Sequence, residues 1–155
     1  MPRKLIFSDR EESFLRELVK NKVPFLVVGL SAATLQGAPV VTQDIDLWFK
    51  NLNHPGIRRA LKKLGGAYVP CIGLNPPQFA GNGLDLFDIV LTVDGLDGFD
   101  KEMKKSLRIP VGRLIVRVLP LERIIRSKKA AGRQKDKLVL PVLEDALKTI
   151  RQSGR

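Results

Sequence analysis

The stretch of sequence that decides the fold reads Thr42-Gln43-Asp44-Ile45-Asp46-Leu47-Trp48-Phe49. Polar and apolar residues alternate in its first part, which predicts a half-buried strand. Aspartate is depleted in strands, so two of them in one strand require an explanation. Side chains two positions apart share one face of a strand, so Asp44 and Asp46 lie side by side while Ile45 and Leu47 enter the core. Two adjacent carboxylates repel each other, and a cation relieves that repulsion.

A second acidic stretch, residues 84–93, is strongly apolar and predicts another strand. It carries Asp85 and Asp88, which are three positions apart and so face opposite sides of a regular strand. Asp88 is the more deeply embedded of the two in the apolar run. If the strands pair, one of these acids joins Asp44 and Asp46. Such an all-oxygen set suits Mg2+ or Mn2+, which carboxylates hold together with substrate phosphates. The alternative is that the acids are surface residues or strand-end caps.

The rest of the chain alternates between helical and strand patterns, which predicts an α+β (mixed α/β) fold with a small mixed sheet flanked by helices. Ser8 and Glu11 have the spacing of a capping box, and Asn53 is a candidate cap before Pro55. Strands are expected at 25–28 and 67–72, and a hairpin at 107–119 that turns near 111–113. Helices are expected after Ser8, at 31–35, from 55 to Gly65, at 121–131 and from about 141 to 151, with loop and some helix at 94–105.

Length and composition favour a single domain over residues 1–155, because 155 residues with 44% hydrophobic content are ordinary for one globular unit. The single cysteine, Cys71, lies in an apolar run and is expected to be buried. No apolar stretch approaches the roughly 20 residues that span a bilayer. No signal-peptide pattern follows the basic N-terminus, so we expect a cytoplasmic protein that does not bind membranes.

The chain is strongly basic, with a formal net charge of +11 and a pI of about 10.2. This charge favours a polyanionic partner such as a nucleoside triphosphate, tRNA or another nucleic acid. The alternative is a solvated basic surface that keeps the protein soluble. One histidine and one cysteine exclude a Ser-His-Asp or Cys-His catalytic set and a zinc site made of those residues.

Residues upstream of the acid pair, Phe25-Leu26-Val27-Val28-Gly29-Leu30-Ser31-Ala32, together with residues 37–47, resemble the nucleotidyltransferase signature of the DNA polymerase β superfamily. The resemblance is to its minimal bacterial and archaeal branch, which is related to abortive-infection toxins. In that pattern, an apolar strand ends in a glycine turn and a short helix leads to a strand with two acids. Residues 87–95 are similar to the strand that bears the family's third acid, and residues 121–136 resemble a later helix and turn.

The resemblance implies a metal-dependent enzyme that moves a nucleoside monophosphate from an NTP to a hydroxyl or phosphate acceptor. Asp44, Asp46 and Asp88 would be the catalytic acids and hold Mg2+ or Mn2+, with Asp88 helping to deprotonate the acceptor. Nucleotide-binding residues would be Gly29 and Ser31 in the turn and the cations Lys128 and Arg133. The acceptor class stays open between a tRNA end, a protein side chain and a small molecule, and the toxin relatives suggest a toxin-antitoxin component.

Two departures from the family pattern support a second hypothesis. Leu30 stands where the family has glycine or serine, and valines (Val40 and Val41) occupy a region that often holds an arginine. The chain is then a catalytically impaired module of the same fold that binds nucleotide, RNA or a protein partner. A third hypothesis is that the domain serves mainly as a subunit for a second chain.

Overall fold

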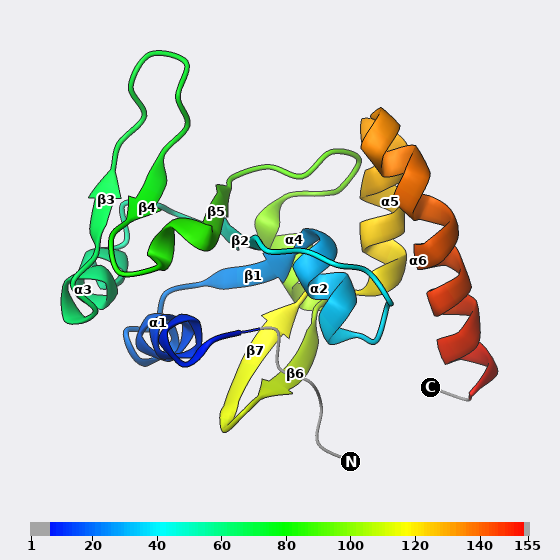
Figure 1. Ribbon diagram of the computed structural model, residues 1–155, viewed down its shortest axis with the longest axis horizontal. Helices are drawn as coiled ribbons and strands as arrows, with labels where there is room; N and C mark the ends of the chain where they lie inside the picture. The colour runs from blue at the N-terminus through cyan, green and yellow to red at the C-terminus, as the bar shows by residue number, and fades with distance from the viewer. Residues whose placement is uncertain (1–6, 154–155) are drawn as a thin grey trace.

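The computed structural model describes residues 7–153, and its centre is a five-stranded sheet in the order β5-β2-β1-β7-β6 (Figure 1). The sheet is mixed: β1 pairs antiparallel with β2 and parallel with β7, β2 runs parallel to β5, and β6 is antiparallel to β7. The strands are β1 (Phe25–Val28), β2 (Ile45–Phe49), β5 (Phe87–Val90), β6 (Leu107–Val111) and β7 (Leu114–Val118). The predicted mixed sheet flanked by helices is confirmed, and so is the hairpin at its end.

The N-terminal half begins with α1 (Asp9–Lys20), whose predicted capping box is present. The Ser8 hydroxyl accepts a hydrogen bond from the Glu11 amide at 3.2 Å, and the Ser8 amide donates to Glu11 Oε1 at 2.9 Å. The short helix α2 (Gly29–Leu35) follows β1 without a loop. Helix α3 (Pro55–Lys63) is capped by His54, whose Nδ1 accepts from the Gly56 amide at 3.0 Å, and not by Asn53 as expected.

A small separate hairpin is formed by β3 (Ala67–Val69) and β4 (Gln78–Ala80), and the loop between them projects from the molecule beside α3 (Figure 1). Cys71 lies in this loop and is exposed, so the expectation of a buried cysteine was wrong. The apolar run is real, but none of the described residues 7–153 buries it, and Ile72 and Leu74 are also exposed. The strand β3 is correspondingly shorter than the predicted 67–72.

The second acidic strand also starts later than expected. Leu84–Leu86 forms a 3-10 turn, η1, and β5 covers only Phe87–Val90. Helix α4 (Phe99–Lys105) then precedes the β6–β7 hairpin. Asp85 therefore lies in the 3-10 turn, outside the strand, whereas Asp88 lies within β5.

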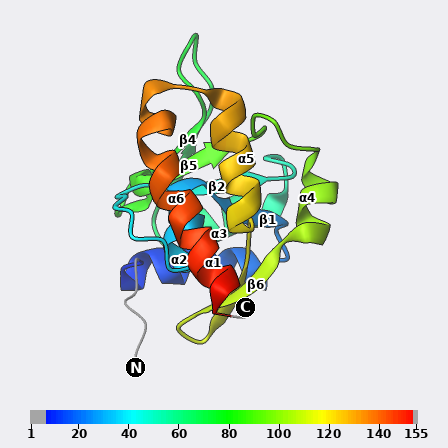
Figure 2. The same ribbon diagram turned by 90° about the vertical axis from the view of Figure 1, so that its right-hand side faces the viewer.

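Two packed helices complete the fold: α5 (Leu121–Ala131) and α6 (Gln134–Gln152), which lie alongside each other in Figure 2. Gly132 joins them in a left-handed conformation with φ +61°. The predicted helix from about 141 begins instead at Gln134, with Pro141 in its interior. Proline is typical of a helix start, but here the helix begins at Gln134, where the Asp136 carboxylate accepts from the Arg133 amide.

The core lies between the sheet and its helices. All four residues of β1 are buried, because the strand is central in the sheet and covered on both faces. Trp48 is buried at 2% exposure, and its indole Nε1 donates to the Leu91 carbonyl at 3.0 Å. Within residues 7–153, no helix combines the length and the apolar character needed to cross a membrane.

Candidate functional site

The strand register brings the predicted acids together. Asp46 pairs with Val28 of β1 on one side and with Asp88 of β5 on the other. Asp44 precedes β2 by one residue, so it does not lie within a regular strand as the alternation predicted. All three acids nevertheless line one cavity, which has a volume of about 500 Å3. Asp85 is exposed on the 3-10 turn and is not among the described residues that line this cavity.

The carboxylates of Asp44, Asp46 and Asp88 repel one another. Burial, followed by the nearby Asp88 and Asp44 carboxylates, raises the pKa of Asp46 from 3.8 to about 6, while Lys128 opposes the shift. Burial and the charge of Asp44 also raise the pKa of Asp88 above its ordinary value. Asp46 and Asp88 also interact through their carboxyl groups, so a proton on either one can be shared by the pair. Without a cation, one proton therefore reduces the repulsion in this pair.

The shift predicts how the stability of the metal-free protein depends on pH. The pKa of Asp46 rises from 3.8 to about 6 on folding, so the folded state binds its proton more tightly than the unfolded chain. The contribution of Asp46 to stability is therefore greatest at low pH and is lost as the pH rises from about 4 to about 6. Thermal unfolding of wild type and Asp46→Asn in EDTA would test this: the difference in Tm, variant minus wild type, should grow across that interval and level off above it. A constant difference from pH 4 to pH 8 would contradict the assignment.

Gly29 allows the backbone to pass directly beside Asp46. Its φ is +65°, and a Cβ at this position would overlap Asp46 Oδ2. Only glycine satisfies both requirements without displacing the acid. The adjacent Leu30 is half-buried and lines the cavity, so the departure from the family pattern lies at the cavity wall itself.

Ser31 has contacts that differ from the predicted phosphate contact. It is fully buried, its hydroxyl donates to the Val28 carbonyl at 2.8 Å, and the same oxygen accepts from the Asp46 amide at 3.2 Å. Ser31 is not among the described residues that line the cavity. Its hydroxyl instead ties the start of α2 to the strand that carries Asp46.

Replacement of Gly29 by alanine tests this close approach. We expect a loss of about 1–2 kcal/mol of stability from the positive φ and, in addition, displacement of the Asp46 carboxylate. Gly37→Ala is the matched control, because Gly37 has a φ of +96° but no atom within 4 Å of the position that a Cβ would occupy. Both variants should lower Tm, whereas only Gly29→Ala should abolish metal-dependent nucleotide binding in calorimetry. Equal binding by the two variants would show that Gly29 has only a backbone role.

The predicted cations face the acids from α5 and from the start of α6. Lys128 and Arg133 line the cavity, and both contact the buried carboxylate of Asp136, which is 1% exposed. Lys128 Nζ lies 3.4 Å from Asp136 Oδ1, and Arg133 Nε lies 2.8 Å from Oδ2. Asp136 also accepts from the Arg133 amide at 3.1 Å, so it both pairs with the arginine and caps α6. One buried acid thus fixes the positions of the two cations.

Several other residues of the cavity wall were not singled out by the sequence. Thr42, Asp94, Ser127 and Lys135 also line it. Asp94 lies at the end of the segment similar to the family's third-acid strand, and Lys135 lies within the basic helix-and-turn segment. The resemblance of these two segments to the family pointed to Asp94 and Lys135. The residue pattern alone did not show which side chains of the segments face the cavity.

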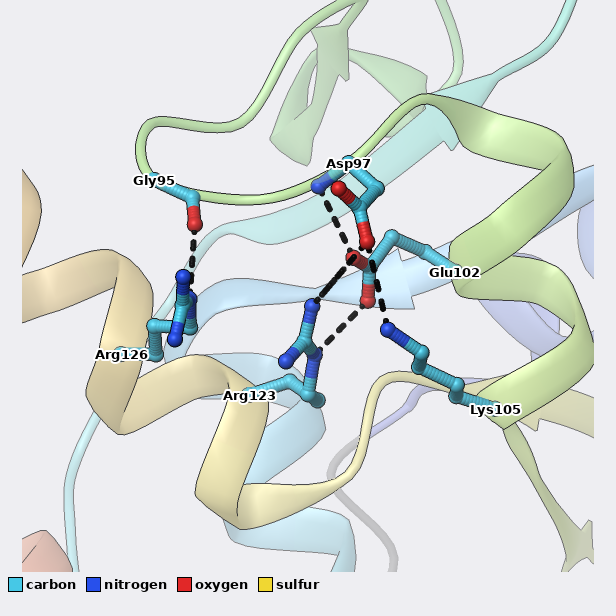
Figure 3. A network of polar contacts seen from close by, with 6 residues as sticks. All are labelled: Gly95, Asp97, Glu102, Lys105, Arg123 and Arg126. Atoms are coloured by element: carbon cyan, nitrogen blue, oxygen red, sulfur yellow. Dashed lines mark hydrogen bonds and ion pairs between the residues drawn. The ribbon is translucent and has the colours of Figure 1, made fainter.

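A buried ion-pair network supports the wall formed by the loop between β5 and α4 (Figure 3). Glu102 of α4 is 0% exposed and accepts from Arg123 of α5, at 3.0 Å from Nε and 2.6 Å from a terminal nitrogen. Glu102 also accepts from the Asp97 amide at 3.0 Å, and Arg126 Nε donates to the Gly95 carbonyl at 3.0 Å. Burial raises the pKa of Glu102, but its hydrogen bonds to Arg123 and Asp97 outweigh that effect and leave the pKa below its ordinary value. These contacts hold the loop against α5, the helix that carries Lys128.

The donor set fits a divalent cation only in combination with a ligand. Within residues 7–153, no three His, Cys, Asp or Glu side chains are grouped closely enough to hold a metal by themselves. Asp46 and Asp88 do form a close pair, and Asp44 acts on both through its charge. Mg2+ is usually held by one or two carboxylates, with substrate phosphates and water completing its shell. The pair therefore fits a cation that arrives with a phosphate ligand.

No protein-family model matches the chain, and no curated protein matches it. Solved structures do match. The chain is similar to a crystal structure of ANT(2")-Ia in complex with adenylyl-2"-tobramycin, with a TM-score of 0.60 and 15% identity over 88% of this chain and 86% of that chain. It is also similar to the solution structure of the antibiotic-resistance factor ANT(2'')-Ia, with a TM-score of 0.60 and 14% identity over 94% of this chain and 89% of the other. The chain has a nucleotidyltransferase fold. The fold expected from the sequence is thereby confirmed, while the particular branch of nucleotidyltransferase-fold proteins stays a prediction.

Proposed function

We propose that the protein is a nucleotidyltransferase that moves a nucleoside monophosphate from an NTP to a hydroxyl or phosphate acceptor. The observation that carries the proposal is the meeting of carboxylates and cations across one cavity. Asp44, Asp46 and Asp88 lie on the sheet side, and Lys128 and Arg133 lie on the helix side. In a nucleotidyltransferase fold, this arrangement suits a triphosphate, whose negative charge requires both a metal held by acids and direct cationic contacts.

Each residue of the cavity has a distinct part in the proposal. Asp44 and Asp46 hold the metal, and Asp88 contributes to metal binding and accepts the proton of the acceptor hydroxyl. Lys128 and Arg133 bind the phosphates, with Asp136 keeping both side chains in place. Gly29 lets the phosphates approach the backbone, while Ser31 positions the strand of Asp46. When bound, Mg2+ or Mn2+ supplies Lewis-acid stabilisation of the transferred phosphoryl group and the leaving pyrophosphate.

The acceptor belongs to one of three classes: a tRNA end, a protein side chain or a small molecule. One of the similar structures, the crystal structure of ANT(2")-Ia, is a complex with adenylyl-2"-tobramycin, which supports a small-molecule hydroxyl as one candidate. The resemblance to toxin-related nucleotidyltransferases supports a cytoplasmic toxin-antitoxin component as the biological setting. These classes differ in whether labelled nucleotide ends up on RNA, on protein or on a small molecule.

Calorimetric titration of each NTP with Mg2+ or Mn2+ tests the proposal. Wild type should bind at least one NTP only when the metal is present, and Asp44→Asn/Asp46→Asn should lose that binding while keeping a cooperative thermal transition. Incubation with labelled NTP and candidate acceptors then tests transfer. Metal-independent binding that survives the double substitution would overturn the assignment of the acids.

A second candidate function rests on Leu30, which lines the cavity beside Gly29. A leucine at this wall occupies space where the family has glycine or serine, so the protein would bind nucleotide, RNA or a protein partner without turnover. This module would show NTP or partner binding but no labelled product with any metal. Leu30→Ser should then restore transfer if leucine is the cause of the impairment.

A further inference from the structure

The outer face of α3 is an unbroken cationic surface. Its exposed side chains include Arg58, Arg59, Lys62 and Lys63, while Ile57, Ala60 and Leu61 turn inward and are buried. Residues three and four apart are neighbours on a helix, so the cations form two rows: Arg58 with Lys62, and Arg59 with Lys63. Along each row the separation is about 6 Å of helix rise, which suits contacts to successive groups of a charged chain.

This surface has no acid to neutralise it. The sequence contains no aspartate or glutamate between Asp46 and Asp85, and the last acid of α1, Glu17, is half-buried. Elsewhere exposed cations do pair: Arg16 with Glu12, Lys129 with Glu144, and Arg151 with Glu122. Within the described part of the chain, the cations of α3 form no ion pair.

The lack of acids argues against a merely solvated surface. Like charges four residues apart destabilise a helix by about 0.2–0.5 kcal/mol per pair. A helix face that only keeps the protein soluble does so with less repulsion when charges of both signs are interspersed on it. The four cations of α3 therefore carry a local cost that a bound polyanion would offset.

Neighbouring elements hold and extend the cationic rows. Arg59 Nε donates to Asn21 Oδ1 at 3.1 Å, and the exposed Lys20 and Lys22 flank Asn21 at the end of α1. The guanidinium of Arg58 lies over the Tyr68 ring of β3, 5.2 Å from its centroid. Two of the cations are thus fixed before any ligand arrives, which lowers the entropy lost on binding. Figure 1 shows α3 at the opposite end of the molecule from α5 and α6.

We propose that α3, together with Lys20 and Lys22, binds the phosphate backbone of a nucleic acid strand at a surface separate from the nucleotide cavity. Membrane attachment fits less well, because a helix that lies on a bilayer presents an apolar face, and no large hydrophobic residue of α3 is exposed. Phosphate contacts of this kind position a strand without reading its bases. The proposal does not depend on nucleotide transfer, since none of these cations lines the cavity.

Fluorescence anisotropy with a labelled single-stranded RNA of about 20 nucleotides tests the proposal over a range of salt concentrations. Lys62→Glu/Lys63→Glu should weaken binding at least tenfold near 100 mM salt and should reduce the slope of log K against log salt by about 1.4, from about 0.7 per lost contact. The matched control is Arg113→Glu/Arg117→Glu, which removes the same charge from exposed positions on β7 and its turn. The control should weaken binding less than twofold.

Additional variants separate the loss of phosphate contacts from a disturbance of α3 itself. Lys62→Gln/Lys63→Gln, which adds no repulsive charge to the helix, should weaken binding in the same direction, and Lys62→Arg/Lys63→Arg should retain binding. Asp44→Asn/Asp46→Asn should bind RNA as wild type does, so failure of one proposal leaves the other testable. A single-stranded DNA of the same sequence should bind within a few-fold of the RNA, because backbone contacts read phosphate in both. Equal loss in both charge-reversal variants, no RNA binding by wild type, or capture only by phosphatidylserine vesicles would overturn the proposal.

Discussion

Asp46→Asn is expected to reduce nucleotide transfer at least 100-fold while leaving the metal-free protein as stable as wild type, or more stable by about 1 kcal/mol, at pH 8. Asp46 is the acid at the meeting point of β1, β2 and β5, and its pKa of about 6 reports that a charge there is unfavourable when no cation is bound. Asparagine removes that charge together with its affinity for a metal. A loss of transfer together with unchanged or higher stability identifies a site that binds a cation and that destabilises the protein when no metal is bound.

The matched control for this prediction is Asp85→Asn. Asp85 is an exposed acid on the 3-10 turn that leads into the same strand as Asp88. Its substitution changes the net charge by the same amount and should leave transfer within about twofold of wild type, because Asp85 is not among the described residues that line the cavity. Transfer rates with labelled NTP and Tm values in EDTA would be measured side by side. A similar loss of transfer in both variants, or full activity in Asp46→Asn, would remove Asp46 from the site.

Arg123→Met is expected to destabilise the protein by at least about 3 kcal/mol, because it leaves the Glu102 carboxylate buried without its partner. Glu102 is 0% exposed and both of its oxygens accept hydrogen bonds from Arg123. In wild type the pKa of Glu102 lies below its ordinary value, so its stabilising contribution is present at neutral pH and is lost as the pH falls through that lowered pKa. In the variant, burial dominates and the sign reverses, so acidification should recover part of the lost stability.

Urea unfolding at pH 5 and pH 7.5 would measure both effects. Arg151→Met is the control, because Arg151 and Glu122 form an ion pair at 3.0 Å with side chains 62% and 58% exposed. Exposed pairs contribute about 0–1 kcal/mol, so this variant should resemble wild type at both pH values. Arg123→Met/Glu102→Gln should regain part of the stability because the buried charge is gone. A loss in Arg123→Met no greater than that in Arg151→Met would show that the network adds little to the fold.

The two predictions address different parts of one site. Asp46 tests the chemistry of the cavity, whereas Arg123 tests the support of one of its walls. The network of Arg123 and Glu102 fastens the loop between β5 and α4 to α5, which carries Lys128. Partial loosening of this wall should therefore raise the NTP concentration needed for half-saturation more than it slows transfer at saturation.

Local patterns in the sequence were sufficient to predict much of this protein. The capping box of α1, the hairpin of β6 and β7 and helix α5 depend on residues close together in the chain, and each was confirmed. The acid pair and the glycine turn also indicated the nucleotidyltransferase fold. The depth of Asp88 within its apolar run likewise favoured it over Asp85, and of these two acids only Asp88 reaches the cavity.

Tertiary structure decided the features that depend on distant residues. The pairing of β2 with β5 sets Asp46 beside Asp88, and the packing of α2 against β2 brings the Ser31 hydroxyl to the Asp46 amide. Proline favours the first turn of a helix, which predicts a start near Pro141, yet the helix begins at Gln134 with Asp136 near its start. Cys71 is exposed because an apolar run is buried only where another element covers it, and no element in the described part of the chain covers the β3–β4 loop. Sequence determined which residue types and local structures are present, whereas packing between remote segments determined which side chains face one another.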